Sequence, residues 1–284
     1  LGVMASLTKL GILAGQSVVV SNGSSHGNTF LAQIVDAVQG VARQAGSLIL
    51  EAGNDALIIS NEHNSYSGAT LVENGTVQAG SNNALGNTAS LTTKSGSTFD
   101  LQGYDQSIGQ LENSGTLKLG NGELTLTSGG SSDQINGLQG SGTLMVTGGD
   151  LQLLAANTNL SANLNITQGG SVTSASQGSL GSSQINFDTT QKNSQLNLMA
   201  DQTLSNALSG KGVVNSVGDV VLSGANQDFT GTHTVSGELS ATSQSNLGGE
   251  GSNIAIADTG ILQLNGFKDT LFSVLSGNSD AAVS

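Results

Sequence analysis

The sequence of 284 residues contains no cysteine, proline or tryptophan, and aromatic residues make up only 3% of it. Without cysteine, disulfide bonds and thiolate metal sites are excluded. Without proline, nothing interrupts a ladder of paired strands, so the turns must be formed by the 41 glycines and by asparagine. The scarcity of aromatic side chains leaves leucine, valine and isoleucine to fill the core.

Charged residues are also scarce. They make up 10% of the chain, well below the roughly 25% of ordinary soluble proteins, so serine, threonine, asparagine and glutamine must cover the surface. Twenty acidic residues against seven basic ones give a formal net charge of −13, and no lysine or arginine occurs between Lys118 and Lys192. This balance disfavours binding to nucleic acid and docking on an anionic membrane, and we expect neither.

Membrane-spanning and leader segments are not evident either. No apolar run approaches the roughly 18 residues of a membrane span, and the N-terminus lacks the charged and apolar regions of a signal peptide. We therefore expect that this chain does not insert into a membrane itself, and that it is a mature chain or a fragment. The lack of cysteine also fits a chain that is exported unfolded through an oxidising compartment, although a cytoplasmic protein could equally lack it.

One pattern occurs three times along the chain. It consists of an asparagine and a ring residue, a Ser/Thr-Gly turn, a short strand and a closing Leu-Gly pair. The first copy runs over residues 64–86 and the third over residues 226–248, with a degenerate middle copy over residues 159–181. Such repeats indicate a solenoid, because each unit buries its apolar face only against its neighbours.

A second, shorter pattern starts at Leu111 and again at Leu138, and we interpret the offset between the two as close to one turn of a coil. Apolar and polar residues alternate within it, as at Leu117 and Leu119, and a period of two predicts strands with one face inward. From residue 47 onward helical periodicity is absent. With about 20 to 27 residues per turn, we predict one all-β domain, residues 1–284, with about 11 to 14 turns of three short parallel strands.

Residues 29–44 depart from this pattern. Their apolar residues, among them Phe30, Leu31, Ile34 and Val35, recur at spacings of three and four, and Thr29 is placed to cap a helix. We predict a short amphipathic helix over residues 29–44, as an insertion or cap that covers the apolar ends of turns. A binding arm is the alternative.

Several strings of the sequence carry a resemblance to a known family. Three segments resemble the passenger-associated repeats of bacterial autotransporters: Tyr66-Ser-Gly-Ala-Thr, Asn83-Ala-Leu-Gly and Ser95-Gly-Ser-Thr-Phe-Asp-Leu-Gln-Gly. The repeats cover residues 47–270. The resemblance implies a right-handed parallel β-helix, exported through the periplasm and across the outer membrane to the bacterial cell surface. It also implies a translocator β-barrel, which we expect to lie outside this chain. Passengers of the AIDA-type adhesins, which this chain resembles, mediate adhesion, aggregation and biofilm formation.

Candidate catalytic residues are few. The histidines His26, His63 and His233 lie in turn or strand contexts without a Gly-x-Ser-x-Gly motif, so we interpret them as exposed polar residues rather than members of a catalytic triad. Parallel β-helices can present paired carboxylates for cleaving polysaccharides, and the candidates would be Asp100, Asp105, Glu112, Glu123, Asp258 and Asp269. Lysines and arginines that would hold an acidic sugar are almost absent. We therefore expect no enzymatic activity and no catalytic residues.

A metal site is equally weak in the sequence. Residues 248–253 read Gly-Gly-Glu-Gly-Ser-Asn, which approaches the Gly-Gly-x-Gly-x-Asp repeat of calcium-binding β-rolls. Asparagine replaces the ligand aspartate, and the motif occurs once, whereas each ion needs ligands from neighbouring repeats. We interpret it as a glycine turn, and expect no metal and no cofactor.

The sequence points instead to a structural and adhesive role. Asn-Gly pairs at the corners of successive turns are expected to stack into amide ladders, at Asn74-Gly75, Asn121-Gly122, Asn136-Gly137 and Asn265-Gly266. Outward rows of Asn, Thr and Asp would form a flat strip whose many weak hydrogen bonds gain from avidity between cells. The expected partners are a copy of itself on a neighbouring cell, or a host matrix protein or glycan. Which residues bind is unknown at this stage.

Two other functions stay open from the sequence. The chain could be a stalk and folding template for a head that precedes Leu1, or, less favoured, a polysaccharide-degrading enzyme. If copies associate with one another, their charge of −13 makes them repel, so we expect association to strengthen with salt or at lower pH.

Overall fold

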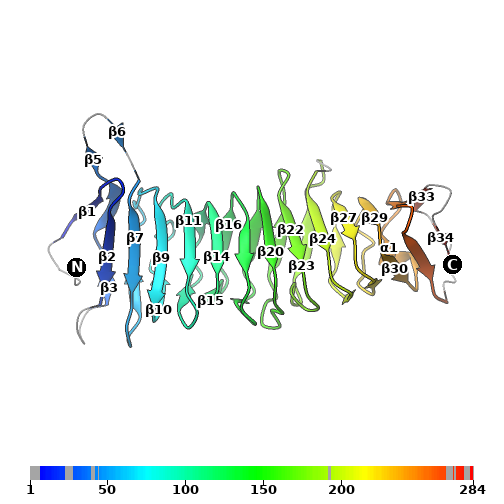
Figure 1. The fold of residues 1–284 in the computed structure, drawn as a ribbon, viewed down its shortest axis with the longest axis horizontal. Helices are drawn as coiled ribbons and strands as arrows, with labels where there is room; N and C mark the ends of the chain where they lie inside the picture. Colours follow the sequence, from blue (N-terminus) through cyan, green and yellow to red (C-terminus); the bar gives the residue numbers. More distant parts are fainter. Residues whose placement is uncertain are drawn as a thin grey trace. The chain divides into compact units, whose positions relative to one another are not determined.

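The computed structural model describes residues 7–22, 28–39, 42–43, 45–190, 193–266, 271, 273–277 and 282–283. The chain forms two compact units, residues 1–144 and residues 145–284. Each unit is a parallel β-solenoid whose strands lie on three faces, called here the first, second and third face (Figure 1). The prediction of a parallel solenoid is confirmed, and that of one domain over residues 1–284 stays a prediction.

In the unit of residues 1–144, strands of successive turns pair in parallel on each face. The first face holds β2 (Ser17–Ser21), β7 (Ser47–Glu51), β9 (Ala69–Asn74), β11 (Ser90–Thr93), β14 (Gln110–Asn113) and β17 (Gly130–Ser132). The second holds β3 (Thr29–Phe30), β8 (Leu57–Ile59), β10 (Thr76–Ala79), β12 (Thr98–Asp100), β15 (Thr116–Lys118) and β18 (Leu138–Gln139). The third holds β13 (Gln106–Ile108) and β16 (Glu123–Leu126).

The unit of residues 1–144 also contains two further strand pairs, and one strand spans the boundary between the two units. A separate parallel pair is formed by β1 (Lys9–Ile12) and β4 (Gln33–Asp36). An antiparallel pair is formed by β5 (Val38–Gln39) and β6 (Ala42–Arg43). Strand β19 (Thr143–Val146) spans the division.

The unit of residues 145–284 repeats the same succession of faces. Its first face holds β20 (Asp150–Leu153), β22 (Ser171–Ser174), β24 (Gln195–Leu198), β27 (Val213–Ser216), β29 (Thr232–Val235), β31 (Asn253–Ile256) and β33 (Val274–Gly277). Its second holds β25 (Gln202–Leu204), β28 (Val220–Leu222), β30 (Glu238–Ala241), β32 (Ile261–Leu264) and β34 (Ala282–Val283). Its third holds β21 (Asn163–Ile166), β23 (Gln184–Phe187) and β26 (Leu208–Ser209), and α1 (Gln244–Leu247) is a single helical turn.

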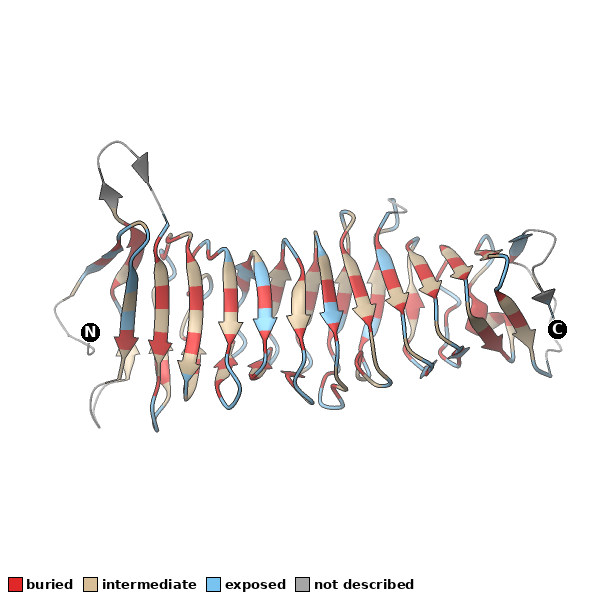
Figure 2. Ribbon diagram, viewed as in Figure 1, coloured by how far each residue is buried: buried red, intermediate tan, exposed pale blue. Residues whose placement is uncertain are grey.

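The core is built by the predicted alternation of inward apolar and outward polar residues. Most of the longer strands show one buried side chain in every two, seen as bands along the strands in Figure 2. The predicted pairs are all inside: Leu117, Leu119, Leu124, Leu126, Leu144, Val146, Leu151 and Leu153. Burial of each such side chain contributes roughly 1.5 to 3 kcal/mol, so the interior ladder is the main source of stability.

The predicted helix over residues 29–44 is wrong for the residues that the structure describes. Phe30 lies in β3 and Ile34 in β4, and with Ala32 between them they are buried at every second position, while Leu31 is 66% exposed. The spacing of three and four arose because Leu31 and Val35 are also apolar. Parallel pairing with β1 and β8 overrides the helical pattern. Residues 40, 41 and 44 lie outside the described part.

The offset between the two copies of the shorter pattern is not one turn. Leu111 lies on the first face, where it pairs with Gly130, whereas Leu138 lies on the second face and pairs with Leu117. Two strands of similar sequence therefore occupy different faces. The turns also differ in length, because Leu196 is much closer in sequence to its partner Val214 than to its other partner, Val172.

The three long repeats share a corner held by one buried asparagine. In the first, Asn64 accepts from the Ile34 N–H at 2.7 Å and donates from Nδ2 to the Ala84 oxygen at 2.6 Å. In the third, Asn226 accepts from the Leu208 N–H at 2.9 Å and donates to the Asn246 oxygen at 2.6 Å. Each asparagine thus joins consecutive turns without leaving a buried amide unpaired.

In the middle repeat the buried asparagine is Asn157, whose Nδ2 donates to the Ser179 oxygen at 2.8 Å, whereas Asn159 is exposed. The start predicted at Asn159 is therefore wrong, and the repeat begins at Asn157. The closing Leu-Gly pair is common to all three corners, with the leucine buried. At Gly181 φ is +57°, and an added Cβ would lie 2.2 Å from the Leu160 carbonyl oxygen, so only glycine fits.

Candidate functional site

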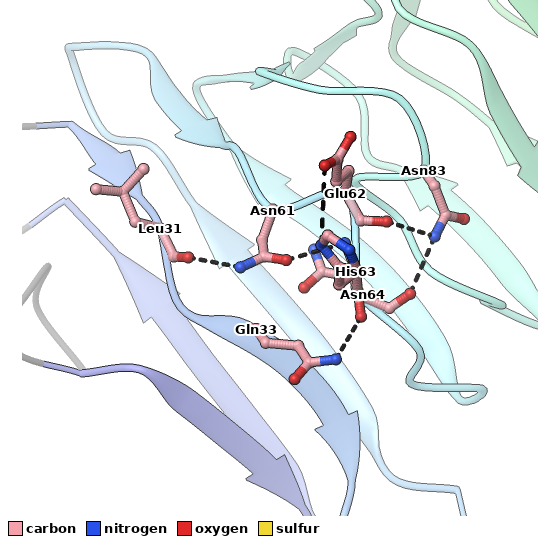
Figure 3. Close-up of polar contacts among 7 residues, drawn as sticks. All are labelled: Leu31, Gln33, Asn61, Glu62, His63, Asn64 and Asn83. Atoms are coloured by element: carbon pink, nitrogen blue, oxygen red, sulfur yellow. Dashed lines mark hydrogen bonds and ion pairs between the residues drawn. The ribbon is translucent and has the colours of Figure 1, made fainter.

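The turn of residues 61–64 carries the first described histidine (Figure 3). His63 Nδ1 lies 3.9 Å from Glu62 Oε1, and the two side chains are 76% and 69% exposed. Carbonyl oxygens of the turn accept from amide side chains of neighbouring turns, because Gln33 Nε2 donates to the His63 oxygen at 2.6 Å and Asn83 Nδ2 to the Glu62 oxygen at 3.1 Å. His63 is therefore an exposed residue on a turn that amides fix to neighbouring turns, as predicted.

His233 is fully buried, so the prediction of an exposed histidine is wrong there. It occupies an inward position of β29, in register with Val214 on one side and Ile254 on the other. Its Nε2 lies 2.9 Å from the Leu247 carbonyl oxygen, and its ring centroid is 4.9 Å from that of Phe229. Burial lowers the pKa of His233 to about 4, although the hydrogen bond to Leu247 raises it.

At neutral pH His233 is therefore uncharged, and it donates from Nε2 to that carbonyl. Its Nδ1 has no hydrogen-bond partner among the described residues. This hydrogen bond joins β29 to the last residue of α1. His26 lies outside the described residues.

The candidate carboxylates are distributed over several faces. Asp100 ends β12 on the second face, Glu112 lies on β14 of the first, and Glu123 begins β16 of the third. Only Asp105 and Glu123 among these are brought together, since Asp105 Oδ1 accepts from the Glu123 N–H at 2.9 Å. Asp258 lies in the turn before β32, and Asp269 lies outside the described residues.

These carboxylates serve the backbone and hydroxyls around them. Asp100 Oδ1 accepts from the Gln102 N–H at 2.9 Å, and Glu123 Oε1 accepts from the Thr125 hydroxyl at 3.1 Å. The Asp100 contact stabilises a turn in which φ is positive at Gln102, whereas the Glu123 contact lies within β16.

The glycine turn of residues 248–253 borders a cavity of about 430 Å³, which is lined by Gln227, Gln244, Ser245, Gly248, Gly249 and Glu250. Gly248 and Gly251 have φ of +128° and +89°. Asn253, at the position of the missing ligand aspartate, begins β31 and donates from Nδ2 to the Gly251 oxygen at 3.4 Å. Across the residues described, no group of three or more His, Cys, Asp or Glu side chains is arranged to hold a metal ion.

The predicted Asn-Gly ladder does not form, because its members occupy two different corners. Asn74 and Asn136 lie at the corner between the first and second faces, whereas Asn121 lies between second-face and third-face strands and Asn265 follows β32. Asn74 Oδ1 accepts from the Gly53 N–H at 3.0 Å, and Asn121 Oδ1 accepts from the Ser141 hydroxyl at 3.0 Å. Each of these two asparagines therefore joins one turn of the solenoid to the next without forming part of a longer ladder.

Side-chain ladders occur instead on the outward side of strands in the unit of residues 145–284. On its first face, Asn215 Nδ2 donates to Asn197 Oδ1 at 2.7 Å, Asn197 Nδ2 donates to Thr173 Oγ1 at 3.2 Å, and Thr173 Oγ1 donates to Asp150 Oδ1 at 2.9 Å. The donors all run in one direction and end on a carboxylate, which is the arrangement expected to strengthen each bond.

A second ladder lies on the third face of the same unit. There Asn186 Nδ2 donates to Asn165 Oδ1 at 2.9 Å, and the Ser209 hydroxyl donates to Asn186 Oδ1 at 2.9 Å. The sequence predicts outward polar rows but not their members, because the register that aligns Thr173, Asn197 and Asn215 depends on turns of unequal length.

The fold and its outward ladders define a parallel β-solenoid with a polar, weakly charged surface. No protein-family model matches the chain, and no solved structure matches it. Sequence similarity is found to an uncharacterized lipoprotein, YdeK, of Escherichia coli (strain K12), which is 30% identical over 235 residues, 73% of this chain. The adhesin BmaC autotransporter of Brucella suis biovar 1 (strain 1330) is 40% identical over 85 residues, 28% of this chain.

An uncharacterized protein, YuaQ, of Escherichia coli (strain K12) is 30% identical over 132 residues, 45% of this chain. The chain spans only 15%, 2% and 9% of the lengths of YdeK, BmaC and YuaQ respectively. In the described residues, no helix is long and apolar enough to cross a membrane. The chain is therefore a parallel β-solenoid with partial sequence similarity to an autotransporter adhesin.

Proposed function

We propose that this chain is part of an autotransporter passenger of the AIDA type, displayed on the bacterial surface as an adhesin that promotes aggregation, biofilm formation or host attachment. The observation that carries the proposal is the outward ladder of Asp150, Thr173, Asn197 and Asn215 on a parallel solenoid. The similarity to an adhesin autotransporter and to a lipoprotein supports a surface location. A right-handed coil and export through the outer membrane belong to the same proposal.

The first face suits adhesion because its hydrogen-bonding groups are repeated at the rung spacing of about 4.8 Å. In register with the ladder lie Gln152 and Thr234, so five consecutive turns present polar side chains at one position. A single hydrogen bond contributes only about 1 kcal/mol net, so binding by such a face depends on many bonds in register. A partner with its own repeated polar groups meets this requirement, and the proposed partners are another copy on a neighbouring cell or a host matrix protein or glycan.

The test is to display the chain on cells and to measure clumping and attachment to matrix proteins and glycans. Gln152→Lys and Gln195→Lys together place two cations on exposed positions of the first face, and they are expected to reduce clumping or attachment. Thr203→Lys and Val221→Lys together place the same two charges on exposed positions of the second face and serve as the matched control. Unchanged clumping and attachment in the first-face double variant, with both proteins equally displayed, would argue against the first face as the adhesive surface.

A second proposal is that the chain is a solenoid that does not itself mediate adhesion. The ladder side chains already bond to one another, as between Asn215 and Asn197, and this favours a stalk and folding template for another part of a longer protein. Replacing residues 1–284 by turns of an unrelated β-solenoid, and finding adhesion unchanged, would favour the stalk.

We propose further that the chain is not an enzyme. The candidate carboxylates Asp100 and Glu112 are spread over different faces, which supports this. Release of reducing sugar from a glycan panel, abolished by Asp105→Asn, would contradict it.

A further inference from the structure

An exposed apolar ridge runs along one corner of the unit of residues 145–284. It consists of the residue that directly follows the first-face strand in six consecutive turns, and five of the six are apolar, the exception being Ser236: Leu154, Ala175, Met199, Val217, Ser236 and Ala257. The three large members, Leu154, Met199 and Val217, are 44%, 50% and 44% exposed. Backbone hydrogen bonds continue the ladder through this position, as from the Met199 N–H to the Ser174 oxygen and from the Val217 N–H to the Leu198 oxygen, both at 3.0 Å.

The fold does not require apolar residues at this position. In the unit of residues 1–144 the equivalent position is polar or charged, with Glu73 near the end of β9 and with Lys94, Ser114 and Asp133 directly after their strands. There Lys94 Nζ lies 2.7 Å from Glu73 Oε2, and the Ser114 hydroxyl donates to Asp133 at 3.2 Å. The backbone contacts are the same, since the Lys94 N–H donates to the Val72 oxygen. An apolar row at a corner that accepts charged residues indicates a contact surface.

A column of carboxylates runs beside the ridge. Asp201, Asp219 and Glu238 each follow a ridge residue by two positions, on three consecutive turns. Their order is fixed, because the Asp219 N–H donates to Asp201 Oδ1 at 2.9 Å and the Glu238 N–H to Asp219 Oδ1 at 3.3 Å. Between residues 193 and 267 the sequence has one lysine and no arginine, and Lys211 precedes β27 whereas Val217 follows it.

This charge pattern favours one class of binding partner for the ridge over the others. A second copy would bring its own row of carboxylates against this one, and an anionic lipid surface would be repelled in the same way. A partner with an apolar stripe bordered by lysine or arginine would contact the ridge with its apolar stripe and the carboxylate column with its basic side chains. Opposite charges across such a contact also steer the encounter and fix the register.

We propose that this ridge, together with its carboxylate column, binds a cationic amphipathic α-helix that lies along the corner. Six turns spaced by about 4.8 Å span about 24 Å, the length of a helix of about 16 residues. One helical turn rises about 5.4 Å, so an apolar side chain of the helix meets nearly every turn of the solenoid. Its basic side chains, one stripe away, then face Asp201, Asp219 and Glu238. This binding is separate from the adhesion proposed for the first face.

The probe is a helical peptide of about 16 residues with leucine on one stripe and lysine on the stripe beside it. A second peptide with glutamine in place of lysine is the matched control. Binding to the full chain is measured by titration calorimetry at low and at high salt. We expect one site, weaker binding as salt rises, and much weaker binding of the uncharged peptide.

Two double variants test the ridge and the carboxylate column separately. Met199→Ser with Val217→Ser is expected to weaken binding about tenfold, because two apolar contacts are lost. Asp201→Asn with Asp219→Asn retains the oxygen that accepts the turn hydrogen bond, and is expected to weaken binding and remove most of its salt dependence. The controls are Ile135→Ser, an exposed apolar residue elsewhere, and Asp133→Asn at the equivalent corner of the other unit, and both should bind as the unchanged chain does.

Circular dichroism confirms that each variant is folded before it is titrated. Binding weaker than about 1 mM, or equal binding of the two peptides, overturns the proposal. So does binding that neither pair of substitutions changes. Sedimentation of the same variants identifies the other occupant: loss of self-association in Met199→Ser/Val217→Ser, with peptide binding intact, would assign the ridge to a second copy and overturn the proposal as well.

Discussion

Replacing His233 with glutamine is expected to change how the stability of the chain depends on pH. Glutamine can donate from its amide nitrogen to the Leu247 carbonyl oxygen, as His233 Nε2 does at 2.9 Å, but it does not titrate. The variant therefore keeps the hydrogen bond and removes the proton equilibrium. Both proteins have the same carboxylates, so the difference between their stabilities isolates His233.

The size of the effect follows from the pKa. Burial lowers the pKa of His233 from 6.5 to about 4 in the folded chain. Above pH 6.5 the ring is neutral in both folded and unfolded chains, and the stability is at its full value. As the pH falls from 6.5 to about 4, the unfolded chain takes up the proton first, so the folded state loses about 3 kcal/mol in total.

The assay is urea unfolding of both proteins at pH 7.5 and pH 4.5. The free energy of unfolding of the unchanged chain, relative to His233→Gln, is expected to fall by about 2 to 3 kcal/mol between these two values. A difference between the two proteins that stays constant with pH would contradict this prediction. It would mean that the ring is either solvated in the folded chain or already charged there.

Two further substitutions test the corners of the long repeats. Gly181→Ala is expected to lower the free energy of unfolding by more than about 2 kcal/mol, because the added Cβ meets a carbonyl oxygen at 2.2 Å. Gly103→Ala is also at positive φ but has no atom within 4 Å of the added Cβ, and it should lower that free energy by about 1 kcal/mol. Thermal unfolding compares the two variants, and equal losses of stability would contradict the steric argument. Asn226→Ala is expected to cost about 2 to 3 kcal/mol, because it leaves two buried backbone groups unpaired, whereas the exposed Asn87→Ala should change stability by less than about 0.5 kcal/mol in the same assay. A small loss for Asn226→Ala would show that water replaces the amide.

The strands were predictable because a narrow solenoid core imposes a period of two. Leu124 and Leu126, or Leu151 and Leu153, can only alternate inward if the segment is a strand, and all four are buried. The short N-terminal segment was not predictable in this way. Ile34 and Val35 are both buried in β4, so strict alternation fails there, and the spacing matches a helix by coincidence.

The polar candidates were harder to place, because a sequence does not show the register between turns. Thr173, Asn197 and Asn215 are unevenly spaced along the chain, and only the structure brings them into one ladder. The same holds for the ridge members Met199 and Val217. His233 was predicted to be exposed because it lies in a turn or strand context without a catalytic motif, yet in β29 it occupies an inward position between two outward threonines.

Sedimentation velocity of the purified chain over a range of protein and salt concentrations, beside clumping of cells that display it, tests whether the solenoid is adhesive. We expect a species that associates reversibly and more strongly as salt rises, since a net charge of −13 opposes self-contact, and association that tracks clumping. A species that stays monomeric at every concentration, on cells that neither clump nor attach to any matrix protein or glycan, would contradict this expectation.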